Sequence, residues 1–320
     1  MRIAFVGKGG SGKTTLTAAF SSFLEKNNVL PTMIFDADIN VNLPLILGFS
    51  EINFEKYLSN PKVVEILKRW FLGKNIIADL GAFRKTTPPT RKSNIIKIRY
   101  LENTPLAQFG FKRNNLYFFA VGTYQDYEIG ASCYHNHLAI FEIILNHLDD
   151  RGGVVVSDMV AGVDAFAGTL HSQFDIICFV TEPTKKSLEV LNHYENLAKN
   201  AGVWENFFVV GNKIRDEEDK SFLKKFISSD KLLGFFIYDD YFHFLEREGG
   251  FMDFDKLNPL NKELIKVVFD KLKNFPDKRN ERIKKIYELH KKYTNQEFIR
   301  LRYGDLSYQI DFDFKFEEDV

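Results

Sequence analysis

Short apolar segments alternate with amphipathic stretches along most of the chain. The first apolar segment, 2–6, is followed by a helical pattern over 13–26 and a second apolar run at 32–35. Further strand patterns lie at 116–121, 153–158, 175–180, 206–212 and 232–238, and helical patterns at 184–200 and 257–274 occupy most of the gaps. Strands this apolar on both faces suit a sheet covered by helices on each side. The pattern predicts an α/β, doubly wound fold with a mostly parallel sheet.

Two regions depart from this rhythm. Residues 82–115 contain adjacent prolines, neighbouring positive charges and no periodic apolar face, which predicts an inserted surface loop or lid. Residues 278–302 carry nine Lys or Arg against three Glu, and 305–320 carry six acids against one lysine. We interpret 276–320 as an appendage to a main domain of 1–275. Its pattern predicts a basic helix and an acidic strand in which apolar residues alternate from 308 to 316.

Composition places the chain among ordinary folded proteins. Its 320 residues are 45% hydrophobic and 27% charged, and 43 basic side chains balance 43 acidic ones. This composition argues against disorder, and the balance of charge argues against a nucleic-acid partner but leaves room for a local basic patch. The sequence contains no transmembrane segment and no secretory leader, and two cysteines are too few for a disulfide framework. These features predict a cytoplasmic protein.

A phosphate-binding motif follows the first predicted strand. Residues 7–15 read GKGGSGKTT, which satisfies G-x-x-x-x-G-K-[ST] and opens a helix. Glycines leave backbone N–H groups free to converge on a triphosphate, and the helix amino terminus adds partial positive charge. Lys13 supplies a full charge to the β and γ phosphates, the Thr14 hydroxyl is a ligand for Mg²⁺, and Thr15 is placed for the α phosphate. The nucleotide-binding residues predicted from this loop are Gly9, Gly10, Ser11, Gly12, Lys13, Thr14 and Thr15.

The second lysine of this loop, Lys8, gives a resemblance to a known family. The motif resembles the deviant Walker A loop, K-G-G-x-G-K-T-T, of the ATPase group that includes the MinD, ParA, nitrogenase iron protein and arsenical-pump types. The resemblance implies a nucleotide-dependent homodimer in which Lys8 reaches phosphates bound by the other subunit, much as an arginine finger does. A solvated surface lysine is the alternative. The resemblance also implies ATP and ADP as ligands and Mg²⁺ as cofactor.

Three further segments resemble motifs of the same group. Phe35–Leu43, FDADINVNL, resembles its D-A-D-P-x-x-N-L switch with Ile39 in place of proline; by resemblance Asp38 orients the attacking water and Asp36 supports the Mg²⁺ region. Asp158 matches the second switch, where the aspartate binds Mg²⁺ through water. Asn212 matches the base-recognising asparagine, whose amide can both donate to and accept from adenine, and Lys213 beside it is also a predicted nucleotide-binding residue. A helix cap is the alternative for Asp38, and a turn residue is the alternative for Asn212.

Segments between 155 and 239, notably TEPTKKSLE and GNKIRDEED, resemble the CooC-type ATPases that deliver nickel to carbon monoxide dehydrogenase. That family carries G-C-x-C-P-x-N before a helix, whereas this chain has GASCYHN, with Ala131 in place of one cysteine. Cys133 and His137, at i and i+4, would share a helix face, and two subunits would then give a Cys₂His₂ site for Zn²⁺ or Ni²⁺. A packed thiol beside solvated histidines is the alternative.

The phosphate motif and the resemblance together imply a Mg²⁺-dependent ATP hydrolase in which nucleotide exchange switches a homodimer between closed and open states, with Lys8, Lys13 and Asp38 as catalytic residues. The resemblance favours a metallocentre maturation role and a metalloenzyme client. The alternative is an ATP-gated positioning or scaffold protein of the MinD or ParA kind that uses 276–320 to bind a partner or nucleic acid.

Overall fold

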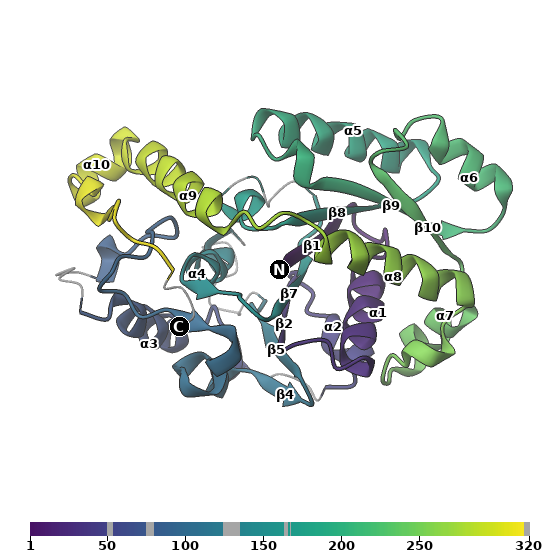
Figure 1. Cartoon of the computed structure of the whole chain (residues 1–320), viewed down its shortest axis with the longest axis horizontal. Helices are drawn as coiled ribbons and strands as arrows, with labels where there is room; N and C mark the ends of the chain where they lie inside the picture. Colours follow the sequence, from purple (N-terminus) through teal and green to yellow (C-terminus); the bar gives the residue numbers. More distant parts are fainter. Residues whose placement is uncertain (50–53, 75–79, 124–134, 163–165, 167, 317–320) are drawn as a thin grey trace.

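The structure, a computed structural model, contains an eight-stranded sheet between two layers of helices (Figure 1). It describes residues 1–49, 54–74, 80–123, 135–162, 166 and 168–316. Seven strands are parallel, and only β4 runs antiparallel to its neighbour β5. In spatial order the strands are β10 (Leu232–Ile237), β9 (Phe207–Ile214), β8 (Ile176–Thr181), β1 (Arg2–Gly7), β7 (Val154–Met159), β2 (Thr32–Ala37), β5 (Leu116–Ala120) and β4 (Phe111–Arg113). The predicted doubly wound fold is confirmed.

Helices cover both faces because the strands present apolar side chains to each side. In β1, Ile3 and Phe5 join one core while Ala4 and Val6 join the other. The Ile3 side packs against α1 (Lys13–Lys26), α2 (Leu43–Leu47), α7 (Asp240–Glu248) and α8 (Pro259–Lys273). The Ala4 side packs against α3 (Pro61–Leu72), α4 (His135–Asn146), α5 (Lys185–Asn200) and α6 (Glu217–Lys224). The phosphate motif lies where β1 turns into α1, at the carboxyl edge of the sheet.

Residues 82–115 do not form the surface loop that their composition predicts. They contain short elements, namely η2 (Leu80–Ala82), β3 (Ile96–Lys97), η3 (Ile98–Asn103), η4 (Pro105–Phe109) and β4. The adjacent prolines, Pro88 and Pro89, are buried, and so are Leu101 and Leu106. Because proline has no backbone N–H, a buried proline adds no donor that needs a hydrogen-bond partner. This insertion is therefore a packed part of the protein.

The C-terminal extension, residues 276–320, begins as the predicted basic helix but does not end as the predicted strand. It contains α9 (Arg279–Thr294), α10 (Glu297–Tyr303) and a 3₁₀ turn, η10 (Ser307–Gln309), and the described residues after Ile237 include no strand. Phe314 packs against Ile283 and Ile286 of α9, so its apolar side chain is buried without pairing in a sheet. In Figure 1 α9 and α10 lie beside the insertion, and Gln309 accepts a hydrogen bond from the Thr87 hydroxyl.

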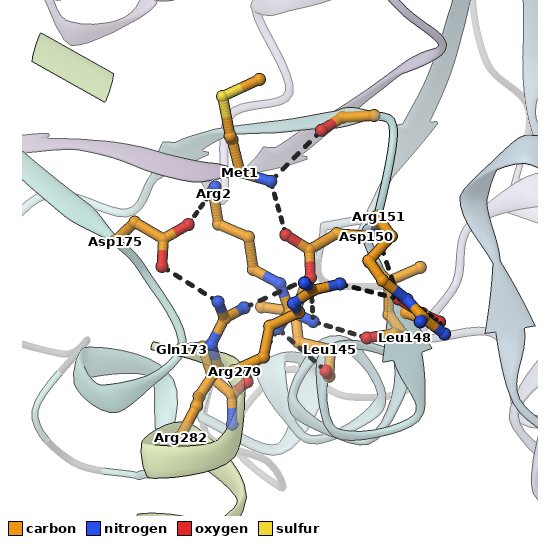
Figure 2. Close-up of polar contacts among 12 residues, drawn as sticks. Met1, Arg2, Leu145, Leu148, Asp150, Arg151, Gln173, Asp175, Arg279 and Arg282 are labelled. Atoms are coloured by element: carbon orange, nitrogen blue, oxygen red, sulfur yellow. Dashed lines mark hydrogen bonds and ion pairs between the residues drawn. The ribbon is translucent and has the colours of Figure 1, made fainter. Parts of the chain in front are cut away.

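A buried cluster of charges fixes α9 to the amino-terminal edge of the sheet (Figure 2). The Arg282 guanidinium donates to Asp175 at 2.9 Å and lies 3.6 Å from Asp150. Arg2, at the start of β1, donates to Asp150 and to the backbone carbonyls of Leu145 and Leu148. Burial would raise the pKa of Asp150, but the charge of Arg2, with further cations nearby, holds that pKa well below its usual value. The extension and the sheet therefore share one buried ionic network.

Candidate functional site

The phosphate loop follows β1 in a backbone conformation that requires glycine. Gly12, which precedes α1, has a φ of +94°, and a Cβ there would lie 2.0 Å from the Asn212 amide nitrogen. Gly7 has a φ of +145°, and a Cβ there would meet the Val180 carbonyl oxygen at 2.5 Å. Both positions therefore exclude any side chain, through backbone strain and through direct overlap.

Donors and a lysine face the space enclosed by this loop. The first backbone bond within α1 runs from the Leu16 N–H to the Gly12 carbonyl, so the N–H groups of residues 13–15 have no partner inside the helix. Lys13 is buried, with its amine 4.0 Å from an Asp38 carboxylate oxygen. The helix terminus and this amine give the loop positive potential suited to an anion.

Thr14 and Asp158 lie together on the other side of the loop. The Thr14 hydroxyl donates to one Asp158 oxygen at 2.6 Å, and the second Asp158 oxygen is buried without a hydrogen-bond partner in the described part of the chain. Burial raises the pKa of Asp158 to about 7, against the opposing effects of Lys13 and Thr14. An orphaned carboxylate oxygen beside a hydroxyl is the donor set that Mg²⁺ prefers.

Asp36 and Asp38 shape the first switch. Asp36 is fully buried and accepts the backbone N–H groups of Asp38 and Leu43. Burial, followed by the nearby charge of Asp158, raises the pKa of Asp36 well above its usual value. Asp38 is half-buried and accepts the backbone N–H of Asn40 at 3.1 Å. Asp36 therefore holds the loop through its backbone, while Asp38 faces Lys13.

Asn212 and Lys213, at the end of β9, brace the phosphate loop. The Asn212 amide donates to the Ser11 carbonyl at 2.7 Å, and the Lys213 amine donates to the Gly10 carbonyl at 2.7 Å. Glu182, after β8, pairs with Lys213 at 2.6 Å. Our sequence reasoning missed Glu182 as a site residue. The available signal was the position of a carboxylate after one strand and a lysine after the neighbouring strand, since such positions meet at one edge of a parallel sheet.

Three further predicted residues are Lys8, His137 and Cys133. The Lys8 side chain is half-buried, and its amine has no hydrogen bond or ion pair within the described ranges. His137 is buried in the first turn of α4 at 5% exposure. Cys133 lies outside the described residues, so its pairing with His137 remains a prediction. Among the residues that the structure describes, no group of three or more His, Cys, Asp or Glu side chains could hold a metal ion.

The observed loop fits a nucleoside triphosphate with Mg²⁺, because its glycines leave room for the phosphates and one Asp158 carboxylate oxygen has no hydrogen-bond partner among the described residues. Comparison with known families agrees: the family described as "CobQ/CobB/MinD/ParA nucleotide binding domain" matches residues 3–241. The chain belongs to this family. It is therefore an ATP-binding P-loop ATPase.

Sequence similarity to curated relatives covers most of this chain. The "Uncharacterized ATP-binding protein MJ0823" of Methanocaldococcus jannaschii is 32% identical over 244 residues, covering 75% of this chain and 86% of the relative. The carbon monoxide dehydrogenase accessory protein CooC of Rhodospirillum rubrum is 25% identical over 240 residues, covering 75% of this chain and 84% of CooC. The CooC resemblance is thus a distant one.

A solved structure supports the fold. The cell division ATPase MinD of Pyrococcus furiosus superposes with a TM-score of 0.53 at 17% identity, covering 84% of this chain and 98% of MinD. At this identity the likeness concerns the arrangement of sheet and helices alone. No helix in the described ranges has the length and apolarity needed to cross a membrane.

Proposed function

We propose that this ATPase is a Mg²⁺-dependent switch that alternates between a closed ATP-bound homodimer and an open ADP-bound state. The observation that carries the proposal is the convergence of Lys13, Thr14, Asp38 and Asp158 at the glycine loop. Closure requires a contact that only the ATP-bound form can make, since a ligand shifts an equilibrium only through differential affinity. Lys8 is the residue we assign to that contact.

Different residues of the chain bind the phosphates, hold Mg²⁺ and orient the attacking water. Lys13 and the α1 amino terminus bind the phosphates, and Thr14 with Asp158 would hold Mg²⁺, whose charge, when the ion is bound, offsets the charge that develops on the phosphates. Asp38, held 4.0 Å from Lys13, orients the attacking water. Asp36 keeps Asp38 in place through two backbone hydrogen bonds to the switch loop.

Asn212 serves two purposes in this proposal. Its amide has two N–H donors and one acceptor oxygen, and one N–H is used on the Ser11 carbonyl. The second N–H and the oxygen remain for the acceptor and donor of an adenine edge. Asn212 can therefore brace the loop and recognise the base without exchanging one contact for the other.

The dimer switch is tested with an Asp38→Ala chain, which should bind ATP without hydrolysing it. Analytical ultracentrifugation with ATP and Mg²⁺ should show a dimer, and adding Lys8→Ala should return a monomer while calorimetry still detects ATP binding. Lys256→Ala, which removes an exposed lysine elsewhere, is the matched control and should remain dimeric. ATP binding by a Lys8→Ala chain that also dimerises would refute the role of Lys8 in trans.

For the biological role we propose metallocentre maturation, supported by the similarity to CooC and by the position of His137 at the start of α4. Cys133 and His137 from two subunits would supply Cys₂His₂ ligands for Ni²⁺ or Zn²⁺ as cargo for a metalloenzyme client. Metal analysis of the purified ATP-bound dimer tests this proposal. One ion per dimer that disappears in Cys133→Ala supports it, and equal metal content in both chains contradicts it.

An ATP-gated positioning or scaffold role is the second candidate, favoured by exposed apolar side chains on the C-terminal extension. Phe298 is 63% exposed and Leu301 is 82% exposed, beside the basic residues Arg300 and Arg302. Such a surface suits attachment to a partner. Liposome sedimentation and salt-dependent DNA retention, each with and without ATP, test it; ATP-dependent retention that is lost in Leu301→Asp would favour this role over metal delivery.

A further inference from the structure

A cavity of about 520 Å³ lies between the ATPase domain and the C-terminal extension, away from the phosphate loop. Its walls come from α5, α9, the insertion near Lys85 and the segment before η7 (Leu170–Ser172). This volume lies within the range of small-molecule sites. Nothing in the ATPase mechanism proposed above uses this cavity.

The cavity combines apolar walls with a basic rim. Leu197 and Leu289 contribute aliphatic surface, and the basic residues Lys85, Lys285 and Lys292 also line the cavity. The Lys292 amine has no ion pair or hydrogen bond in the part of the chain that the structure describes. Apolar surface beside the Lys292 amine matches an organic molecule with an apolar body and an anionic end.

Two acids near the rim leave the balance of charge positive. Glu288 pairs with Lys285 at 3.4 Å, but both side chains are exposed, so this pair is weak and easily exchanged. Glu142 lies behind the lining, 3.6 Å from Lys85, where burial raises its pKa. Three lysines against these two acids still favour an anion, and Lys292 is the amine that is available without breaking an existing pair.

Buried contacts hold the walls in place before any ligand binds. Glu142 accepts both the backbone N–H and the hydroxyl of Thr169, and a Cβ at Gly168 would lie 2.1 Å from the Glu142 carboxylate. In the insertion, the Thr86 hydroxyl lies 2.9 Å from His290 Nδ1 of α9. The network of Figure 2 fixes the start of α9 to the sheet. A cavity whose walls are already ordered binds a ligand at a smaller entropic cost.

We propose that this cavity is a binding site for a small organic anion with an aliphatic or aromatic body, whose charged end lies against Lys285 and Lys292. Lysine amines recognise a carboxylate or a phosphate as point charges, without the planar geometry that arginine imposes. The cavity shares no lining residue with the phosphate loop, so its test does not depend on the dimer switch.

The test uses the full chain and 8-anilino-1-naphthalenesulfonate as a fluorescent probe, with octanoate, octyl phosphate, octanol and acetate as competitors. Octanoate and octyl phosphate should displace the probe. Octanol, which lacks the charge, and acetate, which lacks the apolar body, should not displace it at equal concentration. Displacement by only one of the two octyl anions would support the site and identify its preferred anionic group.

Charge reversal locates the bound probe. Lys285→Glu with Lys292→Glu should weaken the octanoate-displaceable binding roughly tenfold, as expected for reversal of two rim charges. Lys292→Glu alone should give a smaller loss and leaves the Lys285–Glu288 pair in place. Lys284→Glu makes the same change on the exposed side of α9 and should have no effect, and melting temperatures confirm that all variants fold. Equal loss in Lys284→Glu, unchanged binding in the double variant, or displacement by octanol as strong as by octanoate would overturn the proposal.

Discussion

Replacing Arg282 with methionine should destabilise the whole protein, because the guanidinium is buried among carboxylates. The Arg282 side chain is 6% exposed and its partner Asp175 is 10% exposed, so each charge is stabilised by the other more than by water. Removing one member of a buried ion pair typically costs about 3–5 kcal/mol, since the remaining charge is left uncompensated. Asp175 keeps a second hydrogen bond from the Arg2 backbone N–H, which places our expectation near the lower limit, at about 3 kcal/mol.

Urea unfolding followed by tryptophan fluorescence measures this loss, with Arg279→Met as the matched control. Arg279 lies one turn earlier on the same helix, and its nearest partner, Asp277, is 58% exposed. Its second partner, the buried Asp149 at 3.6 Å, keeps an ion pair with Arg151, so the same substitution should cost less, about 1 kcal/mol. Adding Asp175→Asn to Arg282→Met should recover part of the loss, because the uncompensated carboxylate is then removed. Equal destabilisation by Arg279→Met and Arg282→Met would refute the view that a buried ion pair fixes the extension.

Three further outcomes follow from individual sites. Gly12→Ala should abolish ATP binding in calorimetry, because its Cβ would overlap the amide packed on the loop, whereas Gly202→Ala, with positive φ but no atom within 4 Å, should bind ATP normally. Burial lowers the pKa of His290 to about 4; the unfolded chain therefore binds more protons between pH 6.5 and 4, and the free energy of unfolding should fall across that window by at most about 3 kcal/mol. Urea titrations at several pH values should show a shallower fall in His290→Gln, and an unchanged slope would contradict this assignment; exposed His243→Gln is the control. Burial raises the pKa of the Cys178 thiol, so peptide mapping after treatment with a thiol reagent at pH 8 should find Cys178 unmodified until the protein is unfolded.

The sequence was sufficient for features whose signal is local. The phosphate loop needs glycines, a lysine and a threonine at fixed spacing, and the strands around it are continuous apolar runs because both faces are covered. Asp36 and Asp158 could be placed because the carboxyl ends of neighbouring parallel strands meet, and the structure pairs β2 with β7 at these two residues. Thr14 and Asp158 are then within hydrogen-bond distance.

The errors concern segments whose environment is set by distant parts of the chain. The alternation around Phe312 and Phe314 predicted a strand, but a strand needs a free sheet edge, and Phe314 instead meets the apolar face of α9 while Phe312 remains 67% exposed. The insertion appeared polar because its buried positions are scattered among prolines and threonines. Contacts such as Thr86 with His290 connect residues 204 positions apart, and no local pattern could reveal them.

The brace at the end of β9 has a consequence for how nucleotide is captured. Because Asn212 and Lys213 already hold two carbonyls of the phosphate loop, an incoming phosphate meets a loop that has lost most of its freedom. Little ordering remains to be done on binding, so capture should be rapid and its heat should come mainly from the new polar contacts. We therefore expect Glu182, which pairs with the Lys213 amine, to contribute to nucleotide affinity as a remote support.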